Sequence, residues 1–168
     1  MQHNAQRQRW PLRVLVADDN HDAAESLAAL IELWGHEVRV AYHGRSALTI
    51  AQAFHPEVMF LDIGMPEVDG YRVAQAIRAQ KDLANTLLIA VTAYADPESR
   101  EHSRDVGFDF HLVKPVDPVL LERALTVLEQ TQPLLNQVTN AAERGRVLQE
   151  RTWQLRNELR DAIERSAA

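Results

Sequence analysis

The feature that most constrains the fold of this chain is a regular alternation of short apolar runs with stretches whose apolar residues recur at helical spacing. The apolar runs, which predict strands, are residues 13–19, 37–42, 58–61, 87–91 and 110–113. The stretches with helical spacing are residues 22–34, one that opens at Gly44 and continues to Ala51, and 73–77. A polar helix at about 97–105 follows, and a last helix runs from Asp117, its expected N-cap, to about Thr131. Five β-α units with short connections predict a doubly wound α/β fold, a parallel sheet with helices on both faces.

The composition excludes several classes of function. The chain of 168 residues contains no cysteine, which excludes disulfides, thiolate metal sites and thiol catalysis. Its first ten residues are polar and show no signal peptide, and no apolar run is long enough to span a bilayer. We therefore expect a soluble cytoplasmic protein that does not associate with membranes.

The charge argues against nucleic acid as a partner. The formal net charge is −6, and residues 133–168 hold six arginines against five acidic residues, so the acidic excess lies in residues 1–132. A domain with that balance lacks the basic surface that phosphate contacts require. The 36 C-terminal residues also show no short turn between two helices, as a helix-turn-helix module would need.

Polar side chains stand at the carboxyl ends of four predicted strands. Asp18 and Asp19 follow the first strand, Asp62 the third, Thr92 the fourth, and Lys114-Pro115 the fifth. Ligands bind beyond the carboxyl ends of the strands in open parallel sheets. We therefore expect these five polar side chains to converge at one edge of the sheet.

The chemistry of this group indicates phosphoryl transfer. Three neighbouring carboxylates repel one another unless a cation is present, and ligands that are all oxygen favour Mg²⁺, which often completes its shell with phosphate oxygens. A lysine and a threonine hydroxyl can bind further phosphoryl oxygens. One aspartate then remains as the nucleophile, a known role of this residue type.

Four segments carry a resemblance to a known family: the DD pair at 18–19, LDIGMPEVDG at 61–70, VTA at 91–93 and LVKP at 112–115. In order and spacing they resemble the receiver domain of bacterial two-component response regulators, over residues 12–131. The resemblance implies a flavodoxin-like sheet with strand order 2-1-3-4-5. It also implies a phosphoacceptor signalling domain, not an enzyme with a separate substrate.

The resemblance assigns roles to the matching residues. Asp62 would accept a phosphoryl group from a phosphohistidine on a sensor histidine kinase or a phosphotransfer protein. Asp19 would hold Mg²⁺ directly and Asp18 largely through water, with further ligands from Asp62 and the Gly64 carbonyl. Thr92 and Lys114 would contact the phosphoryl oxygens. The Lys114-Pro115 bond is expected to be cis.

The same resemblance identifies residues around the phosphoryl site and two positions that depart from the common family pattern. Ala93, Tyr94 and Pro115 flank the phosphoryl site, and Tyr94 is placed to shield the phosphoryl group. The switch position, usually Tyr or Phe, is His111, and Gly64 offers no side chain to orient an attacking water. Phosphorylation in this family shifts the face made by the fourth helix, fifth strand and fifth helix, and the fourth helix expected here, at 97–105, is short of apolar residues.

The predicted domain organisation is a tail at 1–11, a receiver at 12–131 and a helical extension at 132–168. Nine residues of the extension alternate in spacings of four and three: Leu134, Val138, Ala141, Gly145, Leu148, Thr152, Leu155, Leu159 and Ala162. This pattern predicts one long helix and a homodimer through residues 134–166. Arg151 would face Arg156 of a parallel partner, so antiparallel packing, another protein partner or folding back onto the receiver stay open.

Two other functions were weighed. A receiver that is never phosphorylated could act as a coiled-coil adaptor through its extension. An aspartate-nucleophile Mg²⁺ phosphatase shares the nucleophile, the metal and the lysine. Such a phosphatase needs a second aspartate two residues after the nucleophile as its general acid, and that position is Gly64.

Overall fold

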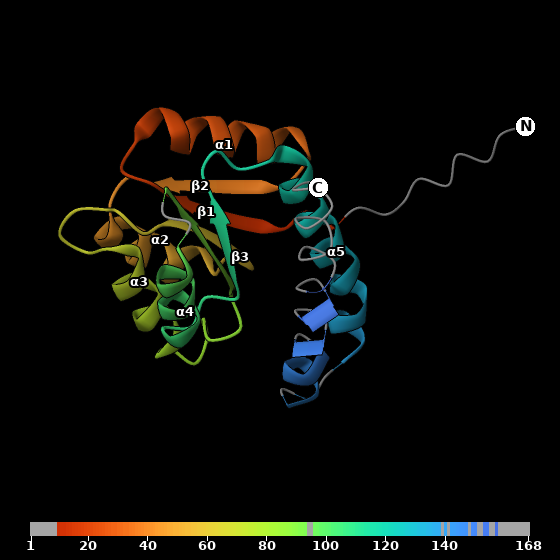
Figure 1. Cartoon of the computed structure of the whole chain (residues 1–168). Helices are drawn as coiled ribbons and strands as arrows, with labels where there is room; N and C mark the ends of the chain where they lie inside the picture. The colour runs from red at the N-terminus through yellow and green to blue at the C-terminus, as the bar shows by residue number, and fades with distance from the viewer. Residues whose placement is uncertain are drawn as a thin grey trace, which may run out of the picture.

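The computed structural model contains one sheet of five parallel strands in the order β2-β1-β3-β4-β5 (Figure 1). The strands are β1 (Arg13–Ala17), β2 (Glu37–Ala41), β3 (Val58–Asp62), β4 (Leu87–Thr92) and β5 (Phe110–Val113). The helices are α1 (His21–Leu33), α2 (Gly44–Phe54), α3 (Gly70–Arg78), α4 (Pro97–Asp105) and α5 (Pro118–Gln137). The predicted fold class and strand order are confirmed.

The structure describes residues 10–93, 96–138, 140, 142–147, 149–150, 153–154 and 157, without the side chains of 131–136. Residues 1–9 of the expected tail lie outside that set. Among the described residues, no helix combines the length and the apolar character that crossing a bilayer requires.

Two hydrophobic clusters cover the two faces of the sheet, because alternate strand residues point to opposite sides. On β1, Val14 and Val16 pack with α1 and α5, while Leu15 and Ala17 pack with α2 and α3. The strands are buried on both faces, as their near-continuous apolar runs predict. The central strands β1, β3 and β4 are therefore rigid supports for whatever follows their carboxyl ends.

Side chains at the helix starts fix where the loops end. Asn20, Asp69 and Asp96 each accept a hydrogen bond from a backbone N–H in the first turn of α1, α3 and α4. At α5, Asp117 accepts from the Val119 N–H at 2.8 Å, which confirms the predicted cap. The loops between strand ends and helix starts are consequently short.

The C-terminal extension differs from the prediction. Helix α5 runs without interruption from Pro118 to Gln137, past its expected end at Thr131, and Val138 and Asn140 are not helical. The prediction of one uninterrupted helix over 134–166 is therefore wrong. The physical reason is a new helix start: Asn140 Oδ1 accepts from the Ala142 N–H at 2.8 Å, and the Asn140 carbonyl accepts from the Arg144 N–H at 2.9 Å.

Further helical residues follow at 142–147, 149–150 and 153–154. Of the heptad positions, Gly145 has open space around its α-carbon, with nothing within 4 Å of a built Cβ. The side chains of most other heptad positions, including Leu148 and Leu155, lie outside the described set. A start signal present in the sequence, Asn140 followed by Glu143 three residues later, marks this break.

Candidate functional site

The carboxylates at the ends of β1 and β3 lie together. One oxygen each from Asp18, Asp19 and Asp62 falls within a group whose members are all within 4.8 Å of one another. Asp18 and Asp62 are buried at 6% and 8% exposure, whereas Asp19 is exposed. The expected convergence of these side chains is confirmed, and the exposed Asp19 leaves the cluster open to solvent on one side.

Lys114, directly after β5, lies across two of the carboxylates. Its Nζ is 2.6 Å from Asp18 Oδ2 and 3.2 Å from Asp62 Oδ1. The backbone N–H of Lys114 donates to the Thr92 carbonyl at 2.8 Å, which ties this residue to the end of β4, and the Lys114-Pro115 peptide bond is cis, as expected. A single ammonium thus partly neutralises a cluster of three acidic groups.

The pKa values of Asp62 and Lys114 are both raised, which disfavours the charged form of the aspartate and favours that of the lysine. Burial raises the pKa of Asp62 above its ordinary value, opposed by the Lys114 charge and reinforced by Asp18. Burial alone would lower the pKa of Lys114, but the hydrogen bond to Asp18 and the charges of Asp62 and Asp18 outweigh it, so that pKa is raised. The lysine is held as a cation, while the charged form of Asp62 is disfavoured until a further cation arrives.

The β3–α3 loop, residues 63–69, closes over Asp62. The backbone of Gly64 acts to lower the pKa of Asp62, against the effect of burial, and the Gly70 N–H donates to the Ile63 carbonyl at 3.2 Å. A Cβ at Gly64 would lie 3.5 Å from Asp62 Oδ2, an ordinary contact, so this position has room for a side chain. At Gly70 a Cβ would lie 2.5 Å from the Asp62 carbonyl, so glycine is required there.

The end of β4 brings Thr92 to the same edge of the sheet, next to the strand that carries Lys114. Thr92 is 2% exposed and pairs in register with Val113 of β5. Ala93 follows it and is exposed. The supporting residue Tyr94 lies outside the described residues.

His111 is half-buried on β5 and contacts α4. Its Nδ1 lies 3.0 Å from the hydroxyl of Ser103, which is fully buried. The Ser103 hydroxyl also donates to the Ser99 carbonyl at 2.8 Å. When that hydroxyl proton is used on Ser99, Nδ1 of His111 must carry the proton that joins it to Ser103. Sequence reasoning identified His111 but not its partner, since nothing in a single sequence pairs residues eight apart across a loop.

The donor set fits a hard divalent cation. The available ligands are three carboxylates, one of them open to solvent, and backbone carbonyls of the β3–α3 loop, all of them oxygen. Mg²⁺ prefers such ligands and retains waters where a site is open. Asp18, Asp19, Asp62 and the Gly64 carbonyl could hold Mg²⁺ here.

A second cluster near this edge was not expected from the sequence. The rings of His21 and Tyr42 stack with centroids 3.8 Å apart, and the Tyr42 hydroxyl donates to Glu25. This hydrogen bond raises the pKa of Tyr42. The contact joins the start of α1 to the end of β2, beside the loop that carries Asp19.

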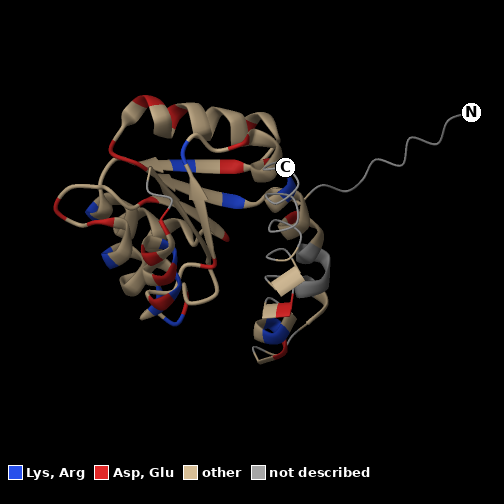
Figure 2. Cartoon of the chain, in the orientation of Figure 1, with Lys and Arg blue, Asp and Glu red and all other residues tan. Residues whose placement is uncertain are grey.

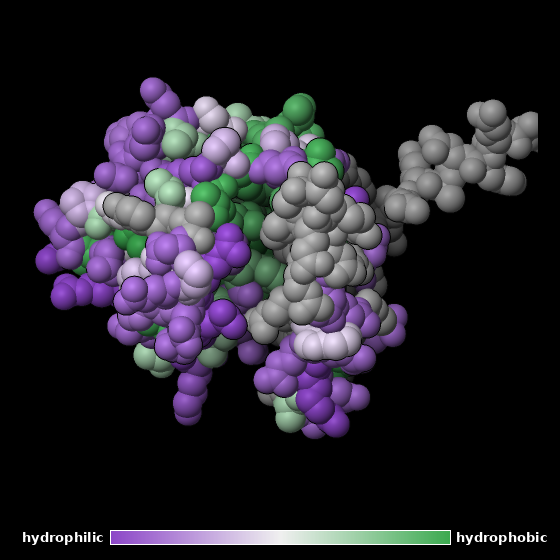
Figure 3. Space-filling view, in the orientation of Figure 1, coloured by the Kyte–Doolittle hydropathy of each residue, from purple (hydrophilic) through white to green (hydrophobic). Residues whose placement is uncertain are grey.

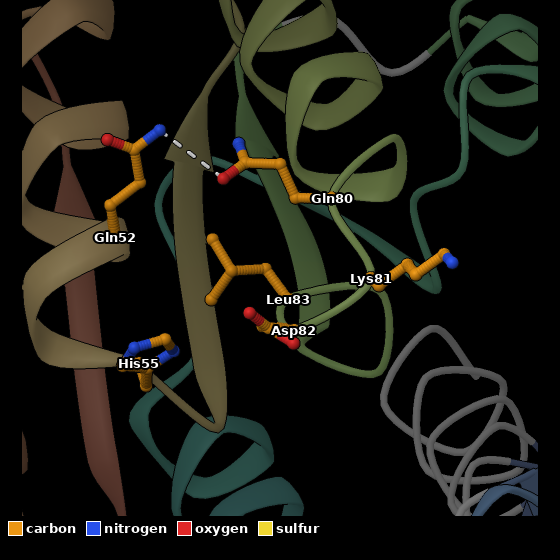
Figure 4. Close-up of a pocket in the computed structure, with 6 residues that line it drawn as sticks. All are labelled: Gln52, His55, Gln80, Lys81, Asp82 and Leu83. Atoms are coloured by element: carbon orange, nitrogen blue, oxygen red, sulfur yellow. Dashed lines mark hydrogen bonds between the residues drawn. The ribbon is translucent and has the colours of Figure 1, made fainter.

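A separate hollow of about 460 Å³ lies at the opposite edge of the sheet (Figure 4). It is formed by the ends of α2 and α3, and it is lined by Gln52, His55, Gln80, Lys81, Asp82 and Leu83. Gln52 donates to Gln80 across it at 3.3 Å, while Lys81 points away from the glutamines. Its polar groups do not converge, so the acidic cluster is the better candidate for chemistry.

Comparison with known proteins agrees with this site. A family model described as the response regulator receiver domain matches residues 14–126. A probable transcriptional regulator, ycf27, of Cyanophora paradoxa is 35% identical over 133 residues, which are 78% of this chain and 54% of the relative. An uncharacterised 14.6 kDa protein of Leptolyngbya boryana is 36% identical over 110 residues, 66% of this chain and 84% of that protein.

The structural comparison gives the same result. The chemotaxis protein CheY4 of Vibrio cholerae superposes with a TM-score of 0.66 and 30% identity over 70% of this chain and 98% of that one. The chain spans about half the length of the Cyanophora paradoxa relative, and 42% of a ycf27 relative from Galdieria sulphuraria. The resemblance drawn from the four sequence motifs is confirmed at the level of the family.

Proposed function

The chain belongs to the response regulator receiver domain family, and we propose that it accepts a phosphoryl group on Asp62 from a phosphohistidine of a sensor histidine kinase or phosphotransfer protein. The observation that carries this proposal is the placement of Asp62. Its carboxylate is buried, lies 3.2 Å from the Lys114 ammonium and shares a 4.8 Å cluster with Asp18 and Asp19. A nucleophile, a cation and a metal-binding pair thereby meet at one point.

In the proposed step, an Asp62 carboxylate oxygen attacks the phosphorus of the donor. The new P–O bond forms as the P–N bond to the donor's imidazole breaks, and the leaving nitrogen keeps that electron pair and takes up a proton. Lys114 binds a phosphoryl oxygen and offsets its charge, and the Thr92 hydroxyl donates to another. A bound Mg²⁺ supplies further neutralisation of the transferring group. The chemistry is limited to phosphorylation and dephosphorylation of the chain itself.

The signal would leave the site through α4. The phosphoryl group adds roughly −1.5 to −2 charges at neutral pH, which draws the Thr92 hydroxyl toward it. His111 on β5 contacts α4 through the hydrogen bond between its Nδ1 and the Ser103 hydroxyl. A shift of the β4–α4 connection would therefore move His111 and change the face made by α4, β5 and α5.

The output would be protein contact, in the cytoplasm and without nucleic acid or membrane. The residues that follow the receiver form helices after α5, and Trp153 among them is 63% exposed. Tryptophan is among the residue types enriched in protein–protein interfaces, so an exposed one on a helix suits association with another surface. A homodimer through residues 134–166 is one form of that association. Truncation after Gln137 would then convert a dimer into a monomer, as light scattering would show from the mass relative to that of one chain. An unchanged number of chains per particle would exclude the homodimer.

The test is intact mass spectrometry of the full chain after incubation with Mg²⁺ and a small-molecule phosphodonor, beside Asp62→Asn. We expect a phosphoryl adduct on the wild type alone, and no adduct when Mg²⁺ is chelated. An adduct that persists in Asp62→Asn would place the acceptor elsewhere. Absence of an adduct from donor and from kinases alike, with Mg²⁺ binding intact by calorimetry, would favour the silent adaptor.

A further inference from the structure

The first residue of α2, Gly44, lies directly against the loop that follows Asp62. Gly44 is buried, and a Cβ built on it would lie 2.2 Å from the Val68 carbonyl oxygen and 2.8 Å from the Val68 Cβ. Real Cβ atoms essentially never make contacts below 3.0 Å, and here the nearest atom belongs to the backbone. Any side chain at position 44 must therefore shift the β3–α3 loop or the start of α2, and either shift changes how the two segments pack.

The β3–α3 loop has little freedom to absorb that displacement locally. The Val68 N–H donates to the Pro66 carbonyl at 2.8 Å, and Glu67 is left-handed with φ 64°. At its ends the loop is closed by the hydrogen bond from Gly70 to Ile63. A closely packed and hydrogen-bonded segment transmits a shift along its length. Val68 lies only four positions after Gly64 and six after Asp62.

Gly44 also stands close to the other half of the acidic cluster. Ala41, three residues earlier, ends β2, and its carbonyl accepts a hydrogen bond from the Asp18 N–H at 3.1 Å. The β2–α2 connection thus contacts the backbone of Asp18 at one end and the loop after Asp62 at the other. The pairing of β1 with β3 fixes the backbones of Asp18 and Asp62 at adjacent strand ends, and the β2–α2 connection contacts the segments that follow both strands.

We propose that Gly44 is a positioning residue for the divalent-cation site: the absence of a Cβ lets the β3–α3 loop seat against α2, which places the Gly64 backbone and the Asp62 carboxylate for cation binding. This inference rests on the proposed function for the identity of the site. Helix α2 supplies no side chain to the acidic cluster. Its first residue would nevertheless control the geometry of that cluster.

The experiment substitutes Gly44→Ala in the full chain and measures two quantities. The first is Mg²⁺ affinity by isothermal titration calorimetry, where we expect the Kd to rise about tenfold, as for other residues that support metal ligands. The second is hydrogen exchange of residues 63–70 in the metal-free protein, which we expect to become faster. Alanine is the better helix former, so a lower helix propensity cannot explain either change.

The matched control is Gly145→Ala, the same substitution in a helix at a position where the Cβ meets nothing within 4 Å. It should leave both quantities unchanged. If Gly44→Ala does not fold, Val68→Ala takes its place, because it removes the methyl groups that rest on Gly44. We expect a smaller change in the same two quantities, about threefold in Kd, since outer-shell substitutions span a range of effects.

Wild-type affinity in a folded Gly44→Ala protein, or wild-type affinity in Val68→Ala where Gly44→Ala does not fold, would overturn the proposal. Faster exchange with unchanged affinity would also overturn it, because the contact would then support only the fold. Failure of the proposed function shows differently: the wild type would bind Mg²⁺ but take no phosphoryl group, and the affinity comparison would still decide the role of Gly44.

Discussion

Helices α3 and α4 have the same length and the same kind of start, yet they are held in different ways. Each has nine residues, follows a strand that ends in a site residue, and is capped by an aspartate, Asp69 or Asp96. Helix α3 buries four residues, Gly70, Val73, Ala74 and Ile77, whereas the one residue that α4 buries is Ser103. Figure 3 shows hydrophilic side chains gathered over α4, and Figure 2 shows charges of both signs on it.

This difference in burial makes α3 a fixed support and leaves α4 able to move. Helix stability in proteins comes mostly from packing of an apolar face rather than from local propensity. Helix α3 is therefore fixed behind Asp62, and α4, beyond Thr92, is held mainly at its far end. There Val106 and Phe108 are buried, and the Arg78 guanidinium donates to the Gly107 carbonyl at 2.9 Å. The start of α4, next to the site, is the end with fewer ties.

The largest expected effect comes from a cavity in α3. Ile77 is fully buried, and Ile77→Ala should lower the free energy of unfolding by about 2–5 kcal/mol through lost burial and the cavity that remains. The matched substitution on α4, Arg100→Ala, changes an exposed side chain and should stay within about 0.5 kcal/mol. Urea denaturation measures both. Similar losses for the two would remove the distinction between the helices.

The second prediction concerns the clamp between α3 and the end of α4. Arg78 donates to the carbonyls of Ala84, Thr86 and Gly107 and pairs with Asp109 at 2.8 Å, with about a quarter of each charged side chain exposed. Arg78→Ala should cost about 2 kcal/mol, the scale of losing hydrogen bonds to a charged group. Hydrogen exchange of residues 104–109 should become faster.

The control for the clamp is Arg72→Ala, an exposed arginine on the same helix, which should change neither quantity. If exchange at residues 104–109 stays slow in Arg78→Ala while the protein loses stability, the clamp holds α3 or β4 and not α4.

The third prediction compares the residues that precede the two helices, Asp62 and Thr92. Burial raises the pKa of Asp62 in the metal-free fold, so the folded state binds a proton more tightly than the unfolded state. Stability therefore falls as pH rises from the unfolded pKa to the folded one, and this loss is complete above the folded pKa. Asp62→Asn should raise the free energy of unfolding at neutral pH in chelator, with a gain that shrinks in acid.

Chemical denaturation across a pH series measures this gain. Thr92→Ser, at the end of the neighbouring strand, adds no titrating group, so its effect should be the same at each pH. A gain for Asp62→Asn that stays constant down to acid pH would contradict the raised pKa.

Local sequence patterns predicted most of this architecture because they act within a few residues. The bounds of α4 agree with the predicted polar helix at 97–105, and those of β5 agree with the apolar run at 110–113. The gathering of Asp18, Asp62 and Lys114 also followed from local signals, since each ends a parallel strand and such ends meet at one edge. What these residues do in the cell stays a prediction.

Contacts between distant segments could not be predicted in the same way. The approach of Gly44 to Val68 depends on how α2 and the β3–α3 loop pack, and no periodicity reports it. The break near Asn140 was missed for a different reason: the heptad spacing on both sides is regular, and a favourable cap within it outweighs the pattern locally. Hydrophobic spacing reports which face is apolar, and it does not report whether one helix or two carry that face.

The smallest expected effect tests Ser103, the one residue that α4 buries. Ser103→Ala removes the hydroxyl 3.0 Å from His111 Nδ1 and the bond to the Ser99 carbonyl, at a cost of about 1 kcal/mol. Because that bond joins α4 to β5, exchange of α4 amides should quicken about fivefold and the His111 ring signals should shift in NMR. Ser99→Ala removes a hydroxyl bonded to Asp96 on the same helix and should leave the His111 signals in place. Unchanged His111 signals in Ser103→Ala would mean that α4 has no side-chain link to the switch residue through this serine, and that His111 follows the motion of β5 alone.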